Sequence, residues 1–265
     1  MGEKLRTPLT YWGGKQMMAG RIIKLLPEPL EDWGYVEPFC GGAAVFWAKP
    51  PSKWEVINDT NREIINFYEQ VKNDFVSLEK MVRISLHSRE HFCDAKHVYK
   101  RPAMFPPLKR AWAVWMLANT AFCGDLHNSF GYSRSDQASK RLANKRDSFT
   151  EGLAIRLQNV QIEACDALRI IRSRDTEKTL FYCDPPYIDS DQGHYDGYGK
   201  NDYESLLEEL SWIKGKFLLS SYRSEPLRLA VAAHGWHSIE IRMPKVVSKG
   251  NTKVEVLTAN YPIHL

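Results

Sequence analysis

The chain has 265 residues, of which 43% are hydrophobic and 26% charged, and its formal net charge is +4. This apolar content is ordinary for a globular protein and is enough for a sizeable core. No apolar run approaches the roughly 18–20 residues of a membrane span, and the N-terminus, MGEKLRTPLTYWGGK, lacks the apolar core of a signal peptide. The composition and the N-terminus therefore exclude a membrane-spanning protein and predict a cytoplasmic one.

Strands and helices alternate in the first 74 residues. The pattern predicts, in order, a strand over 35–39, a helix over 43–48, a strand over 53–59 and a helix over 61–73. The last helix is amphipathic, because Ile64, Ile65 and Val71 recur at helical spacing, and Thr60 is its expected N-cap. This alternation indicates α/β organisation.

The pattern loosens between residues 75 and 150 and then becomes regular again. The middle holds a basic helix, the break RPAMFPP, an apolar helix over 109–122 and a polar, Gly- and Ser-rich stretch over 123–149. Strands are then predicted over 160–165, 179–183, 216–222, 237–243 and 253–261, with helices from Asp166, over 203–213 and over 224–235. The expected fold is a doubly wound α/β domain with a mostly parallel sheet, formed by residues 1–74 and 151–265, with residues 75–150 as an insert.

Charge is distributed unevenly between these two parts. Residues 75–150 contain 13 Lys and Arg against 6 Asp and Glu, a net of +7, whereas the remainder holds 23 against 26, a net of −3. A basic middle in a slightly acidic body predicts that the insert contacts a phosphate-rich partner. A merely solvated charged surface is the alternative.

The five cysteines are odd in number and contain no CxxC pair, which predicts reduced thiols rather than disulfides. One stretch, HSREHFCDAKH, places His87 and His91 four residues apart with Cys93 and His97 nearby. A zinc site is conceivable on such a helix face. No other ligand pair has matching spacing, so the expectation is a solvated helix face and no metal.

A glycine turn follows the first predicted strand in YVEPFCGGAAVFW. Gly41 and Gly42 allow close approach of a ligand to the backbone at the start of a helix, which suits a nucleotide-binding turn or simply a tight connection. Asp59 lies 18 residues beyond Gly41, at the end of the next strand. An acid at that place suits the hydroxyl groups of a ribose. The pair predicts a cofactor that contains a nucleoside.

The apolar strand TLFYC ends on Asp184-Pro185-Pro186-Tyr187. Two prolines cannot donate to a sheet, so the strand stops there. In an open parallel sheet, ligands bind beyond the carboxyl ends of the strands. The carboxylate of Asp184 and the carbonyl of Pro185 are two acceptors, which match an NH2 group, and Tyr187 offers a ring for stacking. A structural turn with Asp184 as a helix N-cap is the alternative.

These motifs, in this order and over nearly the whole chain, closely resemble the Dam-type DNA adenine methyltransferases. Ala43 stands where that family often has a third glycine, and Tyr11-Trp12 replaces a commoner Trp-Ala pair. The resemblance implies S-adenosyl-L-methionine (AdoMet) as cofactor, double-stranded DNA as partner, and a mainly helical and hairpin target-recognition insert. Restriction-modification, phage protection and regulation are the alternative biological roles, and the sequence does not choose among them. FLLSSY and VSKGNTKVEVL resemble the family's late motifs.

The resemblance also carries individual residues over to this chain. It implies that Asp184, Pro185, Pro186 and Tyr187 form the catalytic motif, and that the residues near AdoMet are Tyr11, Trp12, Lys15, Phe39, Cys40, Gly41, Gly42, Asp59, Asp166 and Asp184. The expected reaction moves a methyl group to the N6 amine of an adenine turned out of the duplex. Alternatives are methylation of the N4 amine of cytosine, of an RNA or protein NH2 group, and a DNA-binding relative with little turnover.

The basic insert also offers specific DNA contacts. Arg134, Lys140, Arg141 and Lys145 are expected to neutralise phosphates. Base-reading side chains are expected between Asn119 and Arg134, where NTAFCGDLHNSFGYSR predicts a hairpin or a loop.

Overall fold

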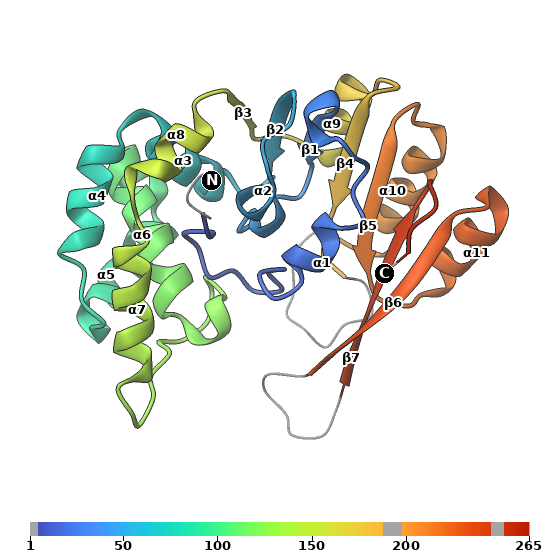
Figure 1. The fold of residues 1–265 in the computed structure, drawn as a ribbon. Coiled ribbons are helices and arrows are strands. Elements are labelled where there is room, and N and C mark those ends of the chain that lie inside the picture. The colour runs from blue at the N-terminus through green and yellow to red at the C-terminus, as the bar shows by residue number, and fades with distance from the viewer. Residues whose placement is uncertain (1–4, 188–197, 245–251, 265) are drawn as a thin grey trace. The chain divides into compact units, whose positions relative to one another are not determined.

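The computed structural model describes residues 5–187, 198–244 and 252–264 (Figure 1). The chain divides into two compact units. The first comprises Met1–Ile23, Cys40–Lys49 and Asp59–Ala164, and the second Lys24–Phe39, Pro50–Asn58 and Cys165–Leu265. Residues 75–150 all fall in the first unit, together with other segments. Their assignment to target recognition is a functional prediction that this division does not test.

The second unit is an α/β sheet. Its strands are β1 (Gly34–Glu37), β2 (Trp54–Asn58), β4 (Thr179–Cys183), β5 (Lys216–Ser221), β6 (His237–Pro244) and β7 (Thr252–Ala259). They lie in the order β2-β1-β4-β5-β7-β6. Pairing is parallel from β2 to β5, whereas β7 runs antiparallel to both β5 and β6. The expected mostly parallel α/β sheet is confirmed.

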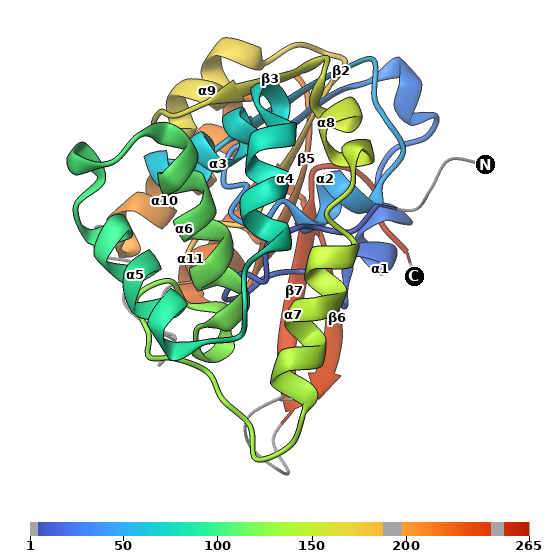
Figure 2. The same cartoon turned by 90° about the vertical axis from the view of Figure 1, so that its left-hand side faces the viewer.

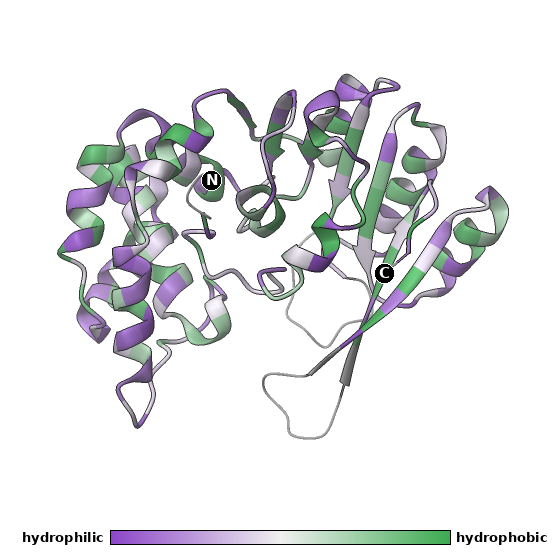
Figure 3. Cartoon of the chain, in the orientation of Figure 1, coloured by the Kyte–Doolittle hydropathy of each residue, from purple (hydrophilic) through white to green (hydrophobic). Residues whose placement is uncertain are grey.

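The core of the second unit explains why these segments form strands and helices. Strands β1 and β4 are buried at every position, and β4 is mostly apolar in sequence (Figure 3 colours the chain by hydropathy). Helices α9 (Ala167–Arg174), α10 (Lys200–Trp212) and α11 (Glu225–His234) contribute apolar side chains to the same cluster, including Ile171, Leu206 and Leu227 against Phe181 and Phe217. Burial on both faces favours parallel pairing of the central strands.

A ligand-binding site is expected where the strand order of the sheet reverses. From β1 the chain continues to β2 on one side, and β4 pairs with β1 on the other side. In open α/β sheets, ligands bind beyond the carboxyl ends of the strands at such a reversal. Phe39 lies two residues after β1, and Asp184 directly follows β4. Both predicted site motifs therefore leave the sheet at this place.

The first unit is mainly helical. Its elements are α1 (Ala19–Ile23), α2 (Ala44–Ala48), α3 (Arg62–Asn73), α4 (Phe75–Arg83), α5 (Arg89–Lys100), η2 (Pro102–Met104), α6 (Pro107–Thr120), η3 (Phe122–Gly124), α7 (Gln137–Asp147), α8 (Glu151–Leu157) and β3 (Val160–Glu163). Helix α6 is buried at every position from Ala111 to Ala118 and contacts α3, α4, α5 and α7 (Figure 2). A helix that is apolar all round belongs in the middle of a bundle.

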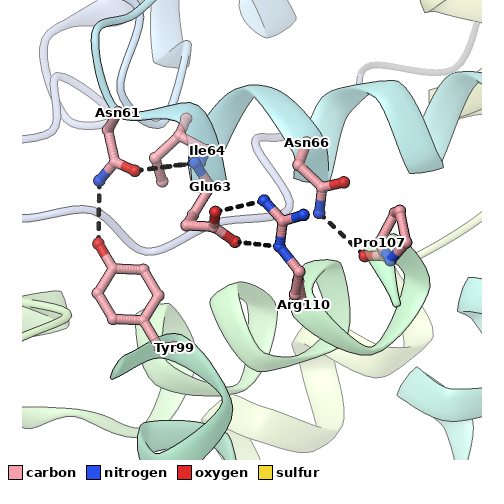
Figure 4. A network of polar contacts seen from close by, with 7 residues as sticks. All are labelled: Asn61, Glu63, Ile64, Asn66, Tyr99, Pro107 and Arg110. Atoms are coloured by element: carbon pink, nitrogen blue, oxygen red, sulfur yellow. Dashed lines mark hydrogen bonds and ion pairs between the residues drawn. The ribbon is translucent and has the colours of Figure 1, made fainter. Parts of the chain in front are cut away.

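Polar contacts fix α3 against its neighbours (Figure 4). The Arg110 guanidinium forms a two-pronged ion pair with the Glu63 carboxylate, with N–O distances of 2.9 and 2.5 Å. The Asn66 side chain donates to the Pro107 carbonyl at 2.9 Å, and the Asn61 side chain donates to the Tyr99 hydroxyl at 3.0 Å. These contacts bind α3 to both α5 and α6.

One local prediction needs correction. The N-cap of α3 is Asn61, whose side-chain oxygen accepts the N–H groups of Glu63 and Ile64, so the prediction of Thr60 is wrong. From this position the Asn61 side-chain oxygen reaches the two free N–H groups at the start of the helix. The polar stretch 123–149 contains the helix α7, which forms over Gln137–Asp147. Its buried residues Ala138 and Leu142 lie four apart on one helix face.

Candidate active site

The glycine turn and Asp59 are joined directly in the first unit. Asp59 accepts the Gly41 N–H at 2.8 Å through one carboxylate oxygen and the Asn61 N–H at 2.9 Å through the other. Burial raises the pKa of Asp59, although the N–H bonds from the backbone oppose this shift. The acid that the spacing predicts as a ribose ligand thus also closes the turn.

The ring of Tyr11 explains why glycines are needed in this turn. Gly41 has φ +45°, and a Cβ built on it would lie 2.9 Å from the Tyr11 ring. A Cβ on Gly42 would lie 2.9 Å from the Tyr11 Cβ. The Thr7 hydroxyl donates to the Gly42 carbonyl at 2.5 Å. The structure therefore brings Tyr11 to the glycine turn.

The next residue of the turn carries strain. Ala43 caps α2 with φ +49° and ψ +41°, the left-handed region that favours glycine. This is the position where the resembling family often has glycine. Ala43 therefore carries a side chain in a backbone conformation that glycine adopts more easily.

Three further cofactor candidates belong to the first unit. Lys15 is 6% exposed, and its ammonium donates to the Gly13 carbonyl at 3.0 Å. Trp12 is half-buried in the same turn, and Cys40 is buried immediately before Gly41. A buried cation close in sequence to Tyr11 suits an anionic group of a ligand.

The Asp-Pro-Pro-Tyr motif is held within the second unit. The Tyr187 hydroxyl lies 3.0 Å from an Asp184 carboxylate oxygen and also contacts a carboxylate oxygen of Glu255 on β7. The Tyr222 ring stands edge-on to the Tyr187 ring, with centroids 4.4 Å apart. Burial, followed by the charges of Asp184 and Glu255, raises the pKa of Tyr187 well above its usual value. Tyr187 is thereby held as a neutral phenol.

Asn58 connects two other predicted site segments and was missed at the sequence level. It is fully buried, and its side chain donates to the carbonyls of Pro38 (2.9 Å) and Cys165 (3.0 Å) while accepting the Cys165 N–H (3.0 Å). Phe39 and Asp166 are the next residues after these two anchors. The only sequence signal for this role of Asn58 was that a polar residue ends a largely apolar predicted strand.

Asp166 has a structural contact as well. It is exposed and accepts the Arg169 N–H at 3.1 Å as the N-cap of α9. The Phe39 ring lies edge-on to the Tyr198 ring, with centroids 6.0 Å apart. Phe39 thus follows β1, and Asp166 begins α9, within the second unit.

The predicted DNA-binding residues differ in their surroundings. Arg134, Lys140 and Arg141 are exposed, and Lys140 forms an ion pair of 2.6 Å with Asp136 on the same helix. The Lys145 ammonium instead donates to the Thr7 carbonyl at 2.8 Å. Burial, with the nearby Arg6 charge, lowers the pKa of Lys145 to about 8. The first three are thus exposed, whereas Lys145 holds the N-terminal segment.

Asn119 also has partners inside the first unit. Its side-chain oxygen accepts the Thr10 N–H (3.2 Å) and hydroxyl (3.0 Å), and its nitrogen donates to the carbonyls of Pro8 (3.0 Å) and Trp115 (2.9 Å). Both donors are in use, so reading a base edge requires breaking these bonds. Asn119 positions the segment that leads to Tyr11.

The histidine-rich helix makes structural contacts. His87 Nε2 is 3.0 Å from the Gly131 carbonyl, His91 Nδ1 accepts the Leu86 N–H at 3.2 Å, and His97 Nδ1 is 2.8 Å from Arg101. Within the described residues, no group of three or more His, Cys, Asp or Glu side chains is arranged to hold a metal ion. In the same part of the chain, no helix is both long and apolar enough to cross a membrane.

The late motifs are only partly described. FLLSSY forms most of β5. The first residues of VSKGNTKVEVL, 247–251, lie outside the described residues, and the rest forms the first part of β7, which contains Glu255.

Comparison with known proteins gives a match over most of the chain. A family model described as D12 class N6 adenine-specific DNA methyltransferase matches residues 11–243. The chain is 27% identical over 245 residues to the type II methyltransferase M1.LlaDCHI of Lactococcus lactis subsp. cremoris, covering 83% of this chain and 82% of that one. It is 24% identical over 285 residues to a DNA adenine methylase of Salmonella typhimurium, covering 98% and 96%. Type II methyltransferase M.FokI of Planomicrobium okeanokoites is 26% identical over 217 residues, covering 77% of this chain and 32% of that one.

Proposed function

The chain belongs to the D12 class N6 adenine-specific DNA methyltransferase family, and we propose that it transfers the methyl group of AdoMet to an adenine turned out of double-stranded DNA. The observation that carries the residue assignment is the place of Asp184. It directly follows β4 where the strand order reverses, and its carboxylate is held by the Tyr187 hydroxyl. This is where an open α/β sheet binds its ligand.

Asp184 and Pro185 supply the two acceptors that an exocyclic amine needs. The lone pair of that amine is delocalised into the base, so the amine is a weak nucleophile. A carboxylate and a carbonyl that accept both N–H groups favour a pyramidal nitrogen and stabilise the positive charge that develops on it. Tyr187 and Pro186 complete the motif, with the Tyr187 ring as a stacking surface for the base.

The first unit fits the cofactor. The glycine turn is closed by Asp59 and covered by Tyr11, and the buried Lys15 ammonium lies four residues from Tyr11. We assign ribose hydroxyls to Asp59 and the methionine carboxylate to Lys15, with Tyr11, Trp12, Cys40, Gly41 and Gly42 around them. Phe39 and Asp166 of the second unit are assigned to the adenine end. Bound AdoMet supplies an electrophilic methyl group.

Residues 75–150 are proposed as the part that binds the target. Their net charge of +7 supports this assignment, and so do the exposed side chains of Arg134, Lys140 and Arg141. The base must leave the helix to reach Asp184, which costs a few kcal/mol for unstacking. Phosphate contacts offset part of that cost.

One experiment tests the function. The protein is incubated with labelled AdoMet and unmethylated DNA of mixed sequence, the DNA is digested to nucleosides, and the methylated base is identified. We expect N6-methyladenine as the product. The rate of its formation should fall by more than about 100-fold in Asp184→Ala, because the carboxylate acts mainly in the transition state. The control is Asp175→Asn, whose carboxylate accepts the N–H groups of Lys214 and Gly215 before β5. Label on cytosine, or near-normal turnover by Asp184→Ala, contradicts the proposal.

A further inference from the structure

Tyr99 of α5 lies between two segments that have different proposed tasks. Its hydroxyl accepts the Asn61 side-chain N–H at 3.0 Å, and Asn61 is the N-cap of α3, two residues after Asp59 (Figure 4). The Tyr99 ring stands edge-on to the His127 ring, with centroids 5.6 Å apart. Asp59 closes the glycine turn, whereas His127 belongs to residues 122–131, the loop that follows α6. All four residues are in the first unit.

On the side of the glycine turn, Asn61 makes contacts through both its backbone and its side chain. Its N–H donates to one Asp59 carboxylate oxygen at 2.9 Å, and the other oxygen accepts the Gly41 N–H at 2.8 Å. The Asn61 side-chain oxygen accepts two N–H groups in the first turn of α3. Its side-chain nitrogen is the group that Tyr99 holds. Tyr99 therefore fixes the side chain of the residue that clamps Asp59.

On the other side, the same helix holds the loop. Lys96 lies one helical turn before Tyr99, and its ammonium donates to the carbonyls of His127 (3.2 Å) and Asn128 (2.8 Å). The His127 N–H donates to the Asp125 carboxylate at 2.9 Å. The backbone of His127 is thus fixed beside the Tyr99 ring.

A second contact joins the loop to the surroundings of the glycine turn. A Cβ built on Gly124 would lie 2.6 Å from the Thr10 carbonyl oxygen, so the loop packs directly on the backbone of Thr10. Gly124 has φ +72°, and glycine permits both this conformation and the close approach. The next residue, Tyr11, has its ring against Gly41. The loop therefore reaches the turn through Thr10 as well as through Tyr99.

These contacts form one packed network between the loop and the turn. We propose that Tyr99 is a positioning residue that ties the loop at residues 122–131 to Asn61 and Asp59, so that filling the cofactor site orders the loop. The inference rests on the proposed AdoMet site and on the proposed role of residues 75–150. Because coupling between two binding sites is reciprocal, DNA that holds the loop also raises the affinity for the cofactor.

The physical reason is the entropy of ordering. A ribose that binds Asp59 restrains its carboxylate, and the restraint passes through the Asn61 N–H to the side chain that Tyr99 holds. A fixed Tyr99 gives the His127 ring a rigid surface on which to pack. A loop that is already ordered loses less entropy when DNA binds, so the second ligand binds more tightly than it would alone.

The first test follows amide exchange without DNA, with S-adenosyl-L-homocysteine, which AdoMet becomes after methyl transfer. In the wild type, this ligand should slow exchange at the glycine turn, residues 40–43, and also across residues 125–131. Tyr99→Phe keeps the ring and loses the hydroxyl. In this variant the slowing across 125–131 should fall at least about twofold, while the slowing at the turn persists.

The matched control is Tyr261→Phe, because it loses a phenol hydrogen bond to the Leu25 carbonyl (3.0 Å) in the second unit. It should keep the wild-type response of the loop. If exchange across 125–131 does not respond to the ligand, or responds equally in the wild type and in Tyr99→Phe, the proposal is overturned.

The second test measures the reciprocal effect on binding. The Kd for S-adenosyl-L-homocysteine is determined by calorimetry with and without saturating duplex DNA of mixed sequence. In the wild type, DNA should lower this Kd about fivefold or more, and the factor should shrink by at least about half in Tyr99→Phe and in His127→Ala. A merely structural role of Tyr99 raises both Kd values equally. An unchanged factor in both variants therefore overturns the proposal.

The exchange measurement separates this inference from the proposed function. If the ligand protects no part of the glycine turn, the proposed cofactor site fails and the inference falls with it. If the turn is protected and the loop is not, the cofactor site stands and the role of Tyr99 fails.

Discussion

Individual residues in this protein take roles that their type alone does not reveal. The Asn58 side chain makes three hydrogen bonds, all with backbone groups, and the Asn119 side chain makes four, one of them with the Thr10 hydroxyl. Lys145 is a cation in a basic segment, yet it holds the Thr7 carbonyl. These side chains position segments that lead to the proposed site.

Replacing Asn58 tests whether it positions the cofactor segments. Asn58→Ala leaves the carbonyls of Pro38 and Cys165 and one N–H without their buried partner, which should lower the free energy of unfolding by about 2–4 kcal/mol. Because Phe39 and Asp166 follow these anchors, the Kd for AdoMet should rise at least about tenfold. Urea unfolding and calorimetric titration measure the two effects.

The matched control for Asn58 is Asn260. Its side chain accepts the Phe217 N–H (3.0 Å) and donates to the Gly215 carbonyl (2.9 Å) at the start of β5, away from the carboxyl ends of the parallel strands. Asn260→Ala should lower stability and leave the AdoMet Kd unchanged. Equal changes of Kd in both variants would show that Asn58 acts only through stability.

Lys145 should make stability depend on pH in alkaline solution. Its pKa is about 8 in the folded chain and about 10.5 when unfolded. Between these values the unfolded chain binds more protons, so raising the pH stabilises the folded state. The free energy of unfolding, wild type minus Lys145→Met, should therefore increase from pH 8 to pH 10.5. A difference that is flat over this range would contradict the burial of a charged Lys145.

At the scale of elements, helix α5 holds the loop that follows α6. The Lys96 ammonium donates to the carbonyls of His127 (3.2 Å) and Asn128 (2.8 Å). The Phe130 ring packs on His87 and Phe92, with centroid distances of 4.7 and 5.5 Å. An isolated antiparallel bridge joins Ala121 to Phe130. The stretch predicted as a hairpin or a loop is thus a short hairpin-like loop, which is held in place by contacts with Lys96, His87 and Phe92.

Releasing this loop should reduce discrimination between DNA sequences. Lys96→Met removes two hydrogen bonds, so amide exchange should accelerate across residues 122–131. The preference for cognate over scrambled DNA should fall by about tenfold if the loop carries base-reading side chains. Lys100→Met, an exposed lysine of the same helix, is the control. Faster exchange with unchanged discrimination would place the base readers elsewhere.

At the scale of the molecule, the charge of residues 75–150 predicts how DNA binding responds to salt. Lys140 and Arg141 are exposed, and the ion pair of Lys140 with Asp136 is a surface pair worth at most about 1 kcal/mol. Each phosphate contact releases condensed counterions. Removing both cations should therefore flatten the plot of log K against log salt by about two units on every duplex.

A control double variant separates a contact from a general effect of charge. Lys200→Gln with Lys214→Gln removes two exposed cations of the second unit. It should keep the wild-type slope, and both double variants should keep the AdoMet Kd. If Lys140→Gln with Arg141→Gln also keeps the wild-type slope, the DNA does not contact these residues.

The sequence by itself determined the elements and the place of the motifs. Local patterns of apolar and turn residues indicated β1, β4 and β5, and two prolines ended β4 at Asp184, because periodicity and turn chemistry are local properties. The glycine turn and Asp59 were also identified from their spacing, and the structure joins them by a hydrogen bond.

Only the tertiary structure decided which side chains meet. Glu255 lies 68 residues after Tyr187, and no local pattern distinguishes it from a glutamate on the exposed face of a strand. The partners of Asn58 are 20 and 107 residues away, and the partner of Lys145 is 138 residues away. Charge counting could not separate Lys145 from Arg141, because burial depends on how distant segments pack. Hydrogen bonding of buried polar groups is settled by the whole fold, since each buried group must find its partner wherever the chain brings one.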